Sequence, residues 1–227
     1  MAAHFPAAKK LRSFFKRLRA DTSGLALVEF AYSLPLLTGI GLYGAELANY
    51  ATVKMRISQT ALALADNASR IGENGVIQDI RITESDINDI LTGSTFSDQD
   101  LNLAGNGRII LSGLRQNVSG GQWIQWQRCA GALTSHTSSY GDAGDGATGT
   151  AFPGMGPTGK EITAAANTSV MFVEIAYMYQ PLFSDAWIPA SPKMTAVAAF
   201  NVRDDRDIDG GNNGIYPVTG VTASTCT

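Results

Sequence analysis

An apolar run with the length of a membrane span lies in the first quarter of the chain. Residues 25–47, at about 1.5 Å of helix rise each, would form a rod of about 35 Å, enough to cross a hydrocarbon core of about 30 Å. Pro35 lies inside the run and predicts a kink or local unwinding, because proline removes a backbone donor. Three glycines, Gly39, Gly41 and Gly44, would either admit a neighbouring helix or face lipid.

The helical pattern continues beyond the apolar run. Apolar residues recur at intervals of three or four, at Tyr50, Val53, Ile57, Ala61, Leu64, Ala68 and Ile71. This is the spacing of one face of an α-helix, and Gly72 is a suitable terminator. We therefore predict one helix from about residue 23 to residue 71. Its first part, residues 25–47, would lie in a membrane, and residues 48–72 would offer an apolar stripe to a soluble domain.

The pattern of residues 73–227 predicts a compact domain. Thr83 precedes Glu84 and Asp86, an arrangement typical of a capped helix start. Four segments rich in β-branched and aromatic residues predict strands, at 108–114, 123–127, 169–179 and 195–202. In the third segment Glu174 lies opposite the apolar side chains, which suits a sheet with one face on a helix and one face less buried. The expected fold class is α+β, a long N-terminal transmembrane helix packed on a small antiparallel sheet.

Residues 135–160 are rich in glycine and poor in apolar residues, which predicts a long loop of functional or disordered character. Residues 154–160 match part of a phosphate-binding loop, but Glu161 stands where Ser or Thr must bind magnesium, so nucleotide binding is not expected. His136 lies near Ser138 and Ser139 in the same loop. No catalytic constellation accompanies them, so a solvated polar stretch is the better interpretation and the chain is not expected to be an enzyme.

Charge divides the chain at Gly24. Six basic residues and one acidic residue lie up to that glycine, whereas 11 basic and 19 acidic residues follow it, a net charge of −8. The leading basic residues are Lys9, Lys10, Arg12, Lys16, Arg17 and Arg19. By the positive-inside rule they hold residues 1–24 in the cytoplasm, so the domain lies on the other side of the membrane. An acidic domain argues against nucleic acid as a partner, since phosphates require a basic surface.

An acidic residue, Glu29, interrupts the apolar run near its start. An ionised carboxylate in a bilayer costs about 2.5–3.5 kcal/mol on insertion scales, so Glu29 is expected to have a functional partner. The order of basic leader, Gly24, four residues, Glu29 and Phe30 resembles the processing site of type IV prepilins. Within that superfamily it is most similar to TadE-like pseudopilins of tight-adherence (Tad) pili. The resemblance covers about residues 12–70.

The resemblance implies that a prepilin peptidase cleaves between Gly24 and Leu25, and that Glu29 meets the new amine of Leu25 on a neighbouring subunit. It also implies a pilin-like fold, and as partners other pilins or pseudopilins, held through the N-terminal helix, and an inner-membrane pilus assembly platform. The chain carries a large domain, unlike the very small major pilins of Tad systems. The expected function is therefore that of a minor pseudopilin that initiates, primes or caps a Tad-type pilus used in adhesion.

The expected location is the bacterial inner membrane, with a cytoplasmic N-terminus and a periplasmic domain, and by resemblance also an extracellular pilus. The alternative is an uncleaved single-pass membrane protein whose periplasmic domain binds a component of a pilus or secretion system. An ordinary secretory signal peptide fits less well, because the apolar segment is too long for one.

Two further hypotheses concern cysteines and acids of the domain. Cys129 and Cys226 are the only two cysteines, and an even count in an oxidising periplasm favours one disulfide, with two unpaired cysteines as the alternative. Asp205, Asp207 and Asp209 alternate as in the first half of a calcium loop, but Tyr216 takes the place of the bidentate Glu. An acidic turn is the alternative to this calcium site, and no other cofactor is expected.

Overall fold

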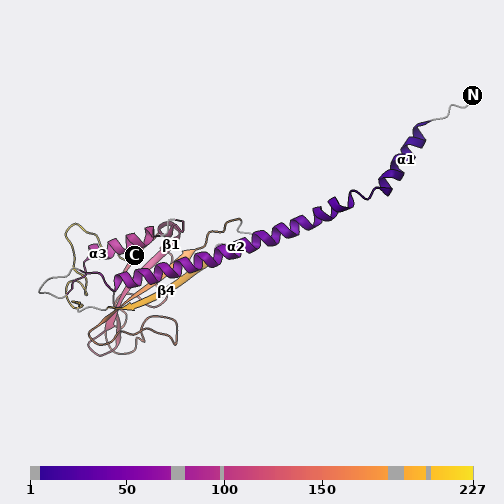
Figure 1. Cartoon of the computed structure of the whole chain (residues 1–227). Coiled ribbons are helices and arrows are strands. Elements are labelled where there is room, and N and C mark those ends of the chain that lie inside the picture. Colours follow the sequence, from indigo (N-terminus) through magenta and orange to yellow (C-terminus); the bar gives the residue numbers. More distant parts are fainter. Residues whose placement is uncertain (1–5, 73–79, 98–99, 184–191, 203–205, 227) are drawn as a thin grey trace, which may run out of the picture. The chain divides into compact units, whose positions relative to one another are not determined.

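A computed structural model describes residues 6–72, 80–97, 100–183, 192–202 and 206–226. The chain divides into two compact units, Met1–Ala48 and Asn49–Thr227. In chain order the described residues form α1 (Pro6–Ala20), α2 (Leu25–Ala68), α3 (Glu84–Phe96), α4 (Leu103–Asn106), β1 (Gly107–Gln116), β2 (Gln122–Ala130), β3 (Ser169–Met178) and β4 (Lys193–Asn201). These elements are drawn in Figure 1, and they confirm the predicted α+β class.

The first unit contains α1 and the beginning of α2. Residues 21–24 separate the two helices, and α2 then runs for 44 residues from Leu25. Among the described residues, α2 is the one helix that is long and apolar enough to cross a membrane. It remains helical through Pro35, so the local unwinding predicted there does not occur. Proline removes a single donor, and the rest of the hydrogen-bond ladder is sufficient to continue the helix.

The end of α2 lies slightly before the predicted one. Ala68 is the last helical residue, and Gly72 follows with a φ of 141°, in the region that favours glycine. Arg206 donates hydrogen bonds to the carbonyl of Ala68, at 3.4 Å, and to that of Ile71. A side chain from the distant C-terminal part of the chain thus satisfies carbonyls that a helix end leaves open.

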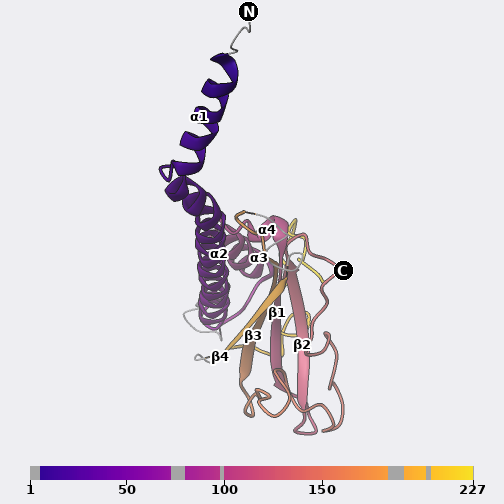
Figure 2. The same ribbon diagram turned by 90° about the vertical axis from the view of Figure 1, so that its right-hand side faces the viewer.

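The four strands form one antiparallel sheet in the order β2-β1-β3-β4 (Figure 2). Ile110 of β1 pairs with Cys129 of β2 and with Glu174 of β3, and Glu174 in turn pairs with Val197 of β4. Each strand includes most of one predicted segment. The sequence left the strand order open, and the structure places β3 in the interior, between β1 and β4.

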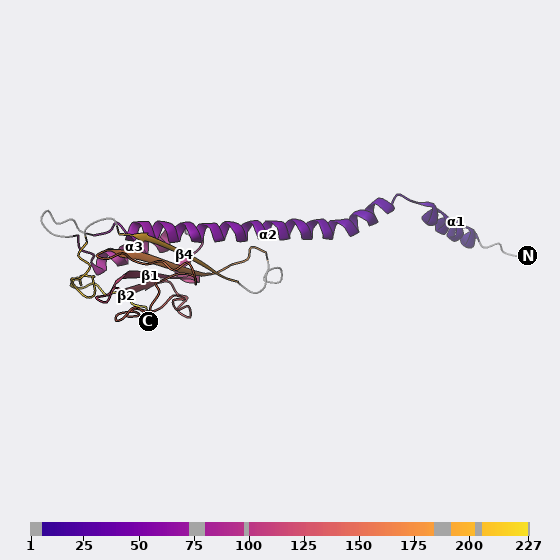
Figure 3. The same ribbon diagram turned by 90° about the horizontal axis from the view of Figure 1, so that it is seen from below.

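The second half of α2, from Asn49 onward, covers one face of the sheet together with α3 (Figure 3). The fully or nearly fully buried residues of this half are Ile57, Ala61, Leu64, Ala65 and Ala68. They share a hydrophobic cluster with Leu111, Val173 and Ile175 of the sheet. The apolar stripe that the sequence predicts on this helix is therefore the surface that packs on the sheet.

α3 begins at the predicted cap. The Thr83 hydroxyl accepts a hydrogen bond from the amide of Asp86 at 3.2 Å, and the Asp86 carboxylate accepts one from the amide of Thr83 at 2.8 Å. This reciprocal arrangement is a capping box. Arg128 of β2 donates from Nε to Glu84 at 2.9 Å, which ties the first turn of α3 to the sheet.

α4 is an element that sequence analysis did not predict. It is a single turn whose start is capped by Asn102, whose side chain accepts the amide of Gly105 at 3.2 Å. Four residues are too few to show a helical period, so its capping residue was the one available signal.

The glycine-rich segment covers the opposite face of the sheet. Met155 and Ile162 pair with each other through their backbones and pack with Phe172 and Ile124 in a second hydrophobic cluster. β3 is consequently buried on both faces, and the expectation of a less buried second face is wrong for this strand. The expectation of a less buried face is confirmed at the edge strand β4, where Val197 keeps 38% of its surface exposed.

Side-chain amides of β2 fasten this segment and the residues just after it to the sheet. The Gln122 carbonyl accepts the amide of Ala164 at 2.7 Å, and that of Gln127 accepts the amide of Ala143 at 3.1 Å. Residues 135–160 contain no helix or strand, so the predicted loop is confirmed. Its backbone groups nevertheless find partners on the sheet, which lets an irregular segment cover an apolar surface.

Candidate functional site

The predicted processing site lies in the link between α1 and α2. Asp21 accepts hydrogen bonds from the hydroxyl and the amide of Ser23, at 2.5 and 2.9 Å, and these bonds hold the pKa of the Asp21 carboxyl below its usual value. The amide of Leu25 donates to the carbonyl of Thr22 at 3.1 Å. The chain therefore makes a short turn here, and α2 begins at Leu25.

Gly24 is not required by the local structure. A Cβ atom built on it would meet nothing within 4 Å, and its φ does not lie in the region that favours glycine. Neither packing nor backbone strain thus explains why this position is a glycine. The fold itself sets no limit on the size of the residue at position 24, so a requirement for a small residue here would arise from a molecule that binds this segment.

The predicted assembly residues lie on the first two turns of α2. Glu29 is exposed, and Phe30 keeps 56% of its surface exposed. Leu25 and Leu27 are also exposed. The beginning of α2 is thus an apolar, accessible surface that carries one carboxylate close to the proposed cleavage point.

The two cysteines form the disulfide that the sequence favoured. Cys129 on β2 and Cys226 in the C-terminal tail are joined, with Cα atoms 5.0 Å apart. The amide of Cys129 also donates to the carbonyl of Ser224 at 2.7 Å, and Asn88 of α3 donates to the carbonyl of Thr222 at 2.9 Å. The tail therefore lies along the outer edge of β2, where it satisfies part of an exposed strand edge.

The acidic turn uses its carboxylates within the protein. Asp207 accepts the amide of Gly210 at 2.8 Å and a hydrogen bond from the Tyr216 hydroxyl, which holds the pKa of Asp207 below its usual value. Asp209 pairs with Arg115 at 2.5 Å. These two carboxylates bind different donor groups of the protein, so they do not converge on one point where a cation could bind. Asp205, the third calcium candidate, lies outside the described residues, and the described residues contain no group of three potential metal ligands.

The partial phosphate-loop match folds as a tight turn. Met155 is fully buried and pairs with Ile162 on the other side of the turn. The Glu161 carboxylate accepts the amide of Gly159 at 2.8 Å, which lowers the pKa of Glu161. The amide of Gly159, which a bound phosphate would use, thus donates to a carboxylate of the protein instead.

A buried polar cluster around Glu174 is the feature that sequence analysis missed. Glu174 is only 1% exposed. Its carboxylate accepts hydrogen bonds from the Ser139 hydroxyl at 2.7 Å, the Ser139 amide at 3.0 Å and the Ser138 hydroxyl at 3.2 Å. His136 Nε2 lies 3.0 Å from the same carboxylate. One strand residue therefore holds the beginning of the glycine-rich loop at several points.

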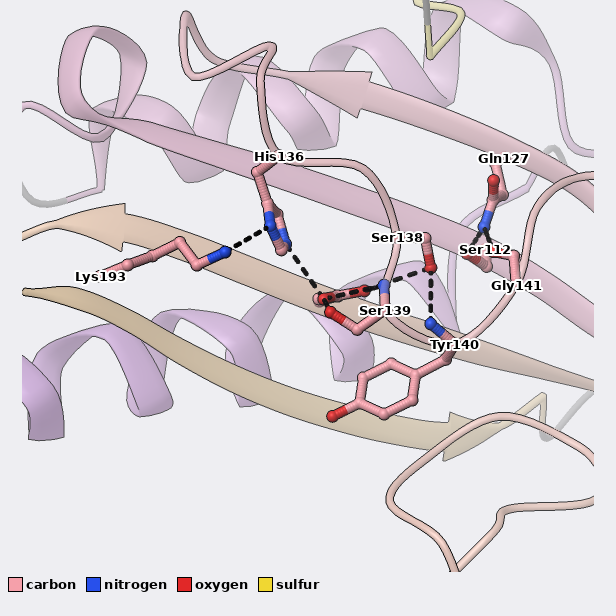
Figure 4. Close-up of polar contacts among 9 residues, drawn as sticks. Ser112, Gln127, His136, Ser138, Ser139, Tyr140, Gly141 and Lys193 are labelled. Carbon is pink, nitrogen blue, oxygen red and sulfur yellow. Dashed lines mark hydrogen bonds and ion pairs between the residues drawn. The ribbon is translucent and has the colours of Figure 1, made fainter.

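The proton positions in this cluster follow from its donors. Lys193 Nζ lies 3.4 Å from His136 Nδ1, and the two side chains point toward one another in Figure 4. An ammonium group can only donate, so Nδ1 accepts and the proton of a neutral imidazole is assigned to Nε2, which donates to Glu174. Burial, and secondarily the charge of Glu174, raises the pKa of the nearby Tyr140.

This cluster does not have the order of a nucleophile, base and acid. In a catalytic triad the histidine lies between the nucleophile and the carboxylate. Here the carboxylate lies in the middle, because Ser138, Ser139 and His136 all bind Glu174. The cluster is therefore an anchor for the loop, built from residues that superficially match a hydrolase set.

In comparisons with known proteins, no family model matches the chain, and neither a curated protein nor a solved structure matches it.

Proposed function

We propose that this chain is a minor pseudopilin of the TadE-like kind, which takes part in the initiation, priming or capping of a Tad-type pilus. One observation carries the proposal. An accessible turn that includes Gly24 separates a basic helix from an apolar helix that begins at Leu25 and displays Glu29 after one turn. A leader, a cleavable link and a membrane helix with one early acid are the parts that such a subunit requires.

The chemistry of cleavage gives Glu29 a role. Hydrolysis of the bond between Gly24 and Leu25 would create a cationic amine at the N-terminus of α2, where the helix dipole is positive and disfavours a cation. An unpaired carboxylate in lipid is disfavoured as well. Pairing the amine with Glu29 of a neighbouring subunit removes both penalties, so that helix packing and charge neutralisation occur together.

The domain fits a subunit whose function is binding. The serines and histidine of its loop are engaged in holding Glu174, and the two described acids of the turn bind protein groups. We therefore propose that the domain acts as a non-enzymatic module on the periplasmic side of the inner membrane. The partners proposed for the whole chain are other pilins or pseudopilins, held through the N-terminal helix, prepilin peptidase and an inner-membrane assembly platform.

The N-terminus of the mature protein tests the proposal. We expect the intact mass and N-terminal sequence of the protein from native membranes to show a chain that begins at Leu25. Gly24→Val should remain folded, because the position has free space, but should accumulate with its leader attached. Gly24→Ala is the matched control and should still be cleaved.

Two results would contradict this function. A wild-type chain that retains residues 1–24 in cells producing the filament would identify an uncleaved membrane anchor. Cleavage of Gly24→Val at the wild-type rate would show that no peptidase selects for a small residue at this position.

A further inference from the structure

The segment that follows β3 is fastened to α2 at its base. The Asn49 side chain donates to the Tyr179 hydroxyl at 2.8 Å, and the rings of Tyr50 and Tyr179 meet edge to face at 5.2 Å. Tyr179 is fully buried. The base of this segment is therefore held against the first turn of α2 in the second unit.

Two residues a little further along the same segment are apolar and exposed. Leu182 and Phe183 keep 60% and 50% of their surfaces exposed. Leu182 lines a groove of about 480 Å³ with Asn49 and Thr52 of α2. Two large apolar side chains next to each other on a protein surface call for a specific explanation, because exposed apolar surface is unfavourable in water.

The position along α2 supplies that explanation. Asn49 and Thr52 follow Leu47, the last residue of the expected span, by two and five positions, which is about 3–8 Å of helix. The headgroup layer on each side of a hydrocarbon core is about 5–8 Å thick. With residues 25–47 in the hydrocarbon core, the rise along α2 would bring Asn49 and Thr52, and with them the groove that Leu182 lines, to the depth of lipid headgroups, where apolar and aromatic side chains are stable.

We propose that residues 180–183 form a second membrane contact, in which Leu182 and Phe183 insert into the lipid interface beside the point where α2 leaves the bilayer. The contact rests on the proposed membrane span of α2. It would restrict the tilt of the domain on the membrane, because two points of attachment define an orientation that one helix alone does not.

Labelling of single cysteines in the full chain tests the contact. The native cysteines are joined to each other, so Leu182→Cys, Phe183→Cys, Val118→Cys and Leu36→Cys each offer one thiol for an environment-sensitive fluorophore. Each labelled protein is reconstituted into vesicles of phosphatidylethanolamine and phosphatidylglycerol that contain lipids brominated in their acyl chains. Val118 is a matched control, because it is fully exposed. It follows the C-terminal end of β1, which pairs with the beginning of β3 and not with the end of β3 that leads to residues 180–183.

We expect bromine to quench the fluorophores at 182 and 183 several-fold more than the fluorophore at 118, and nearly as much as the one at 36. Equal, weak quenching at 182, 183 and 118 with strong quenching at 36 would overturn the contact and leave the span intact. Weak quenching at 36 as well would overturn the span, and the contact with it. The emission of the fluorophore at position 182 could instead report an apolar environment in native membranes but not in pure lipid. That result would identify a protein on this surface and overturn the lipid contact.

Discussion

At the residue scale, Glu174 is a buried charged side chain that joins the glycine-rich loop to the interior strand β3. It is nearly inaccessible and accepts hydrogen bonds from a backbone amide and two hydroxyls, beside His136. A buried carboxylate is tolerated when several donors compensate for its lost hydration. This explains how a charged residue can occupy the centre of the interior strand β3.

We predict that Glu174→Ala lowers the free energy of unfolding by at least about 3 kcal/mol, because each buried donor left without an acceptor costs about 1–3 kcal/mol. Denaturant unfolding of the full chain in detergent, followed by tryptophan fluorescence, measures the loss. Asp89→Ala on the exposed side of α3 is the control and should change stability by about 0.5 kcal/mol or less. Equal stability of the two variants would show that the Glu174 cluster does not hold the domain together.

The sequence predicted the orientation of Glu174 but not its partners. Alternation along β3 placed the carboxylate on the face opposite the helix, and the pairing of Ile110, Glu174 and Val197 agrees with this. His136 and Ser139 come from a loop that lies about 35 positions earlier. Local pattern carries no information about which loop folds over a strand, so the serines and histidine looked like solvated residues.

At the element scale, the C-terminal tail protects one edge of the sheet. β2 is an edge strand, and its outer side meets the tail through the disulfide and the bond between Cys129 and Ser224. Exposed strand edges invite pairing with other chains, and natural proteins often cover them. The disulfide closes a loop across a separation of 97 residues, so in the chain-entropy account it restricts the unfolded state strongly.

We predict that the double variant Cys129→Ser with Cys226→Ser lowers the free energy of unfolding by about 2–5 kcal/mol. The amide at position 129 should also exchange its hydrogen faster, by more than the lower global stability accounts for, whereas the amide of Val173 in the interior strand should lose protection only by the drop in global stability. Hydrogen exchange read by mass spectrometry distinguishes the two segments. Unchanged exchange at position 129 would mean that hydrogen bonds alone hold the tail in place.

Elements with a strong local signal were predicted well, and those fixed by distant contacts were not. The capping residues of α3 and the β-branched segments of the four strands were visible in the sequence. The strand order was not, because β3 reaches its place beside β1 only after the long segment that separates it from β2. The carbonyls near the end of α2 are likewise satisfied by Arg206, a residue more than 130 positions away.

At the scale of the whole molecule, charge and hydropathy divide the chain into parts with different environments. The leader is basic, the following segment is apolar and contains Glu29, and the residues after Gly24 carry a net charge of −8. The positive-inside rule predicts a cytoplasmic leader for such a chain, which is the orientation that the proposed function requires. The sequence alone predicts this division, since it depends on composition along the chain and not on tertiary contacts.

The part of the proposal that concerns assembly depends on Glu29. Leu25 and Glu29 lie four positions apart on one helix, so they face the same side. In a filament the amine of Leu25 and the carboxylate of Glu29 could each pair with a neighbouring subunit. The pair between subunits forms only when the helices pack, so the loss of Glu29 should weaken assembly, whereas membrane insertion does not require this pair.

We therefore predict that Glu29→Ala reaches the membrane at the wild-type level and is cleaved, but is depleted at least about a hundredfold from purified filaments. Removing one partner of a buried charge pair costs about 3–5 kcal/mol, and each 1.4 kcal/mol corresponds to about tenfold. Immunoblots of membranes and sheared filaments measure the two pools. Ser33→Ala, one turn further along the same exposed helix, should be incorporated normally. Normal incorporation of Glu29→Ala would remove the pairing role, even if cleavage at Leu25 is found, because the amine would then need no carboxylate from this residue.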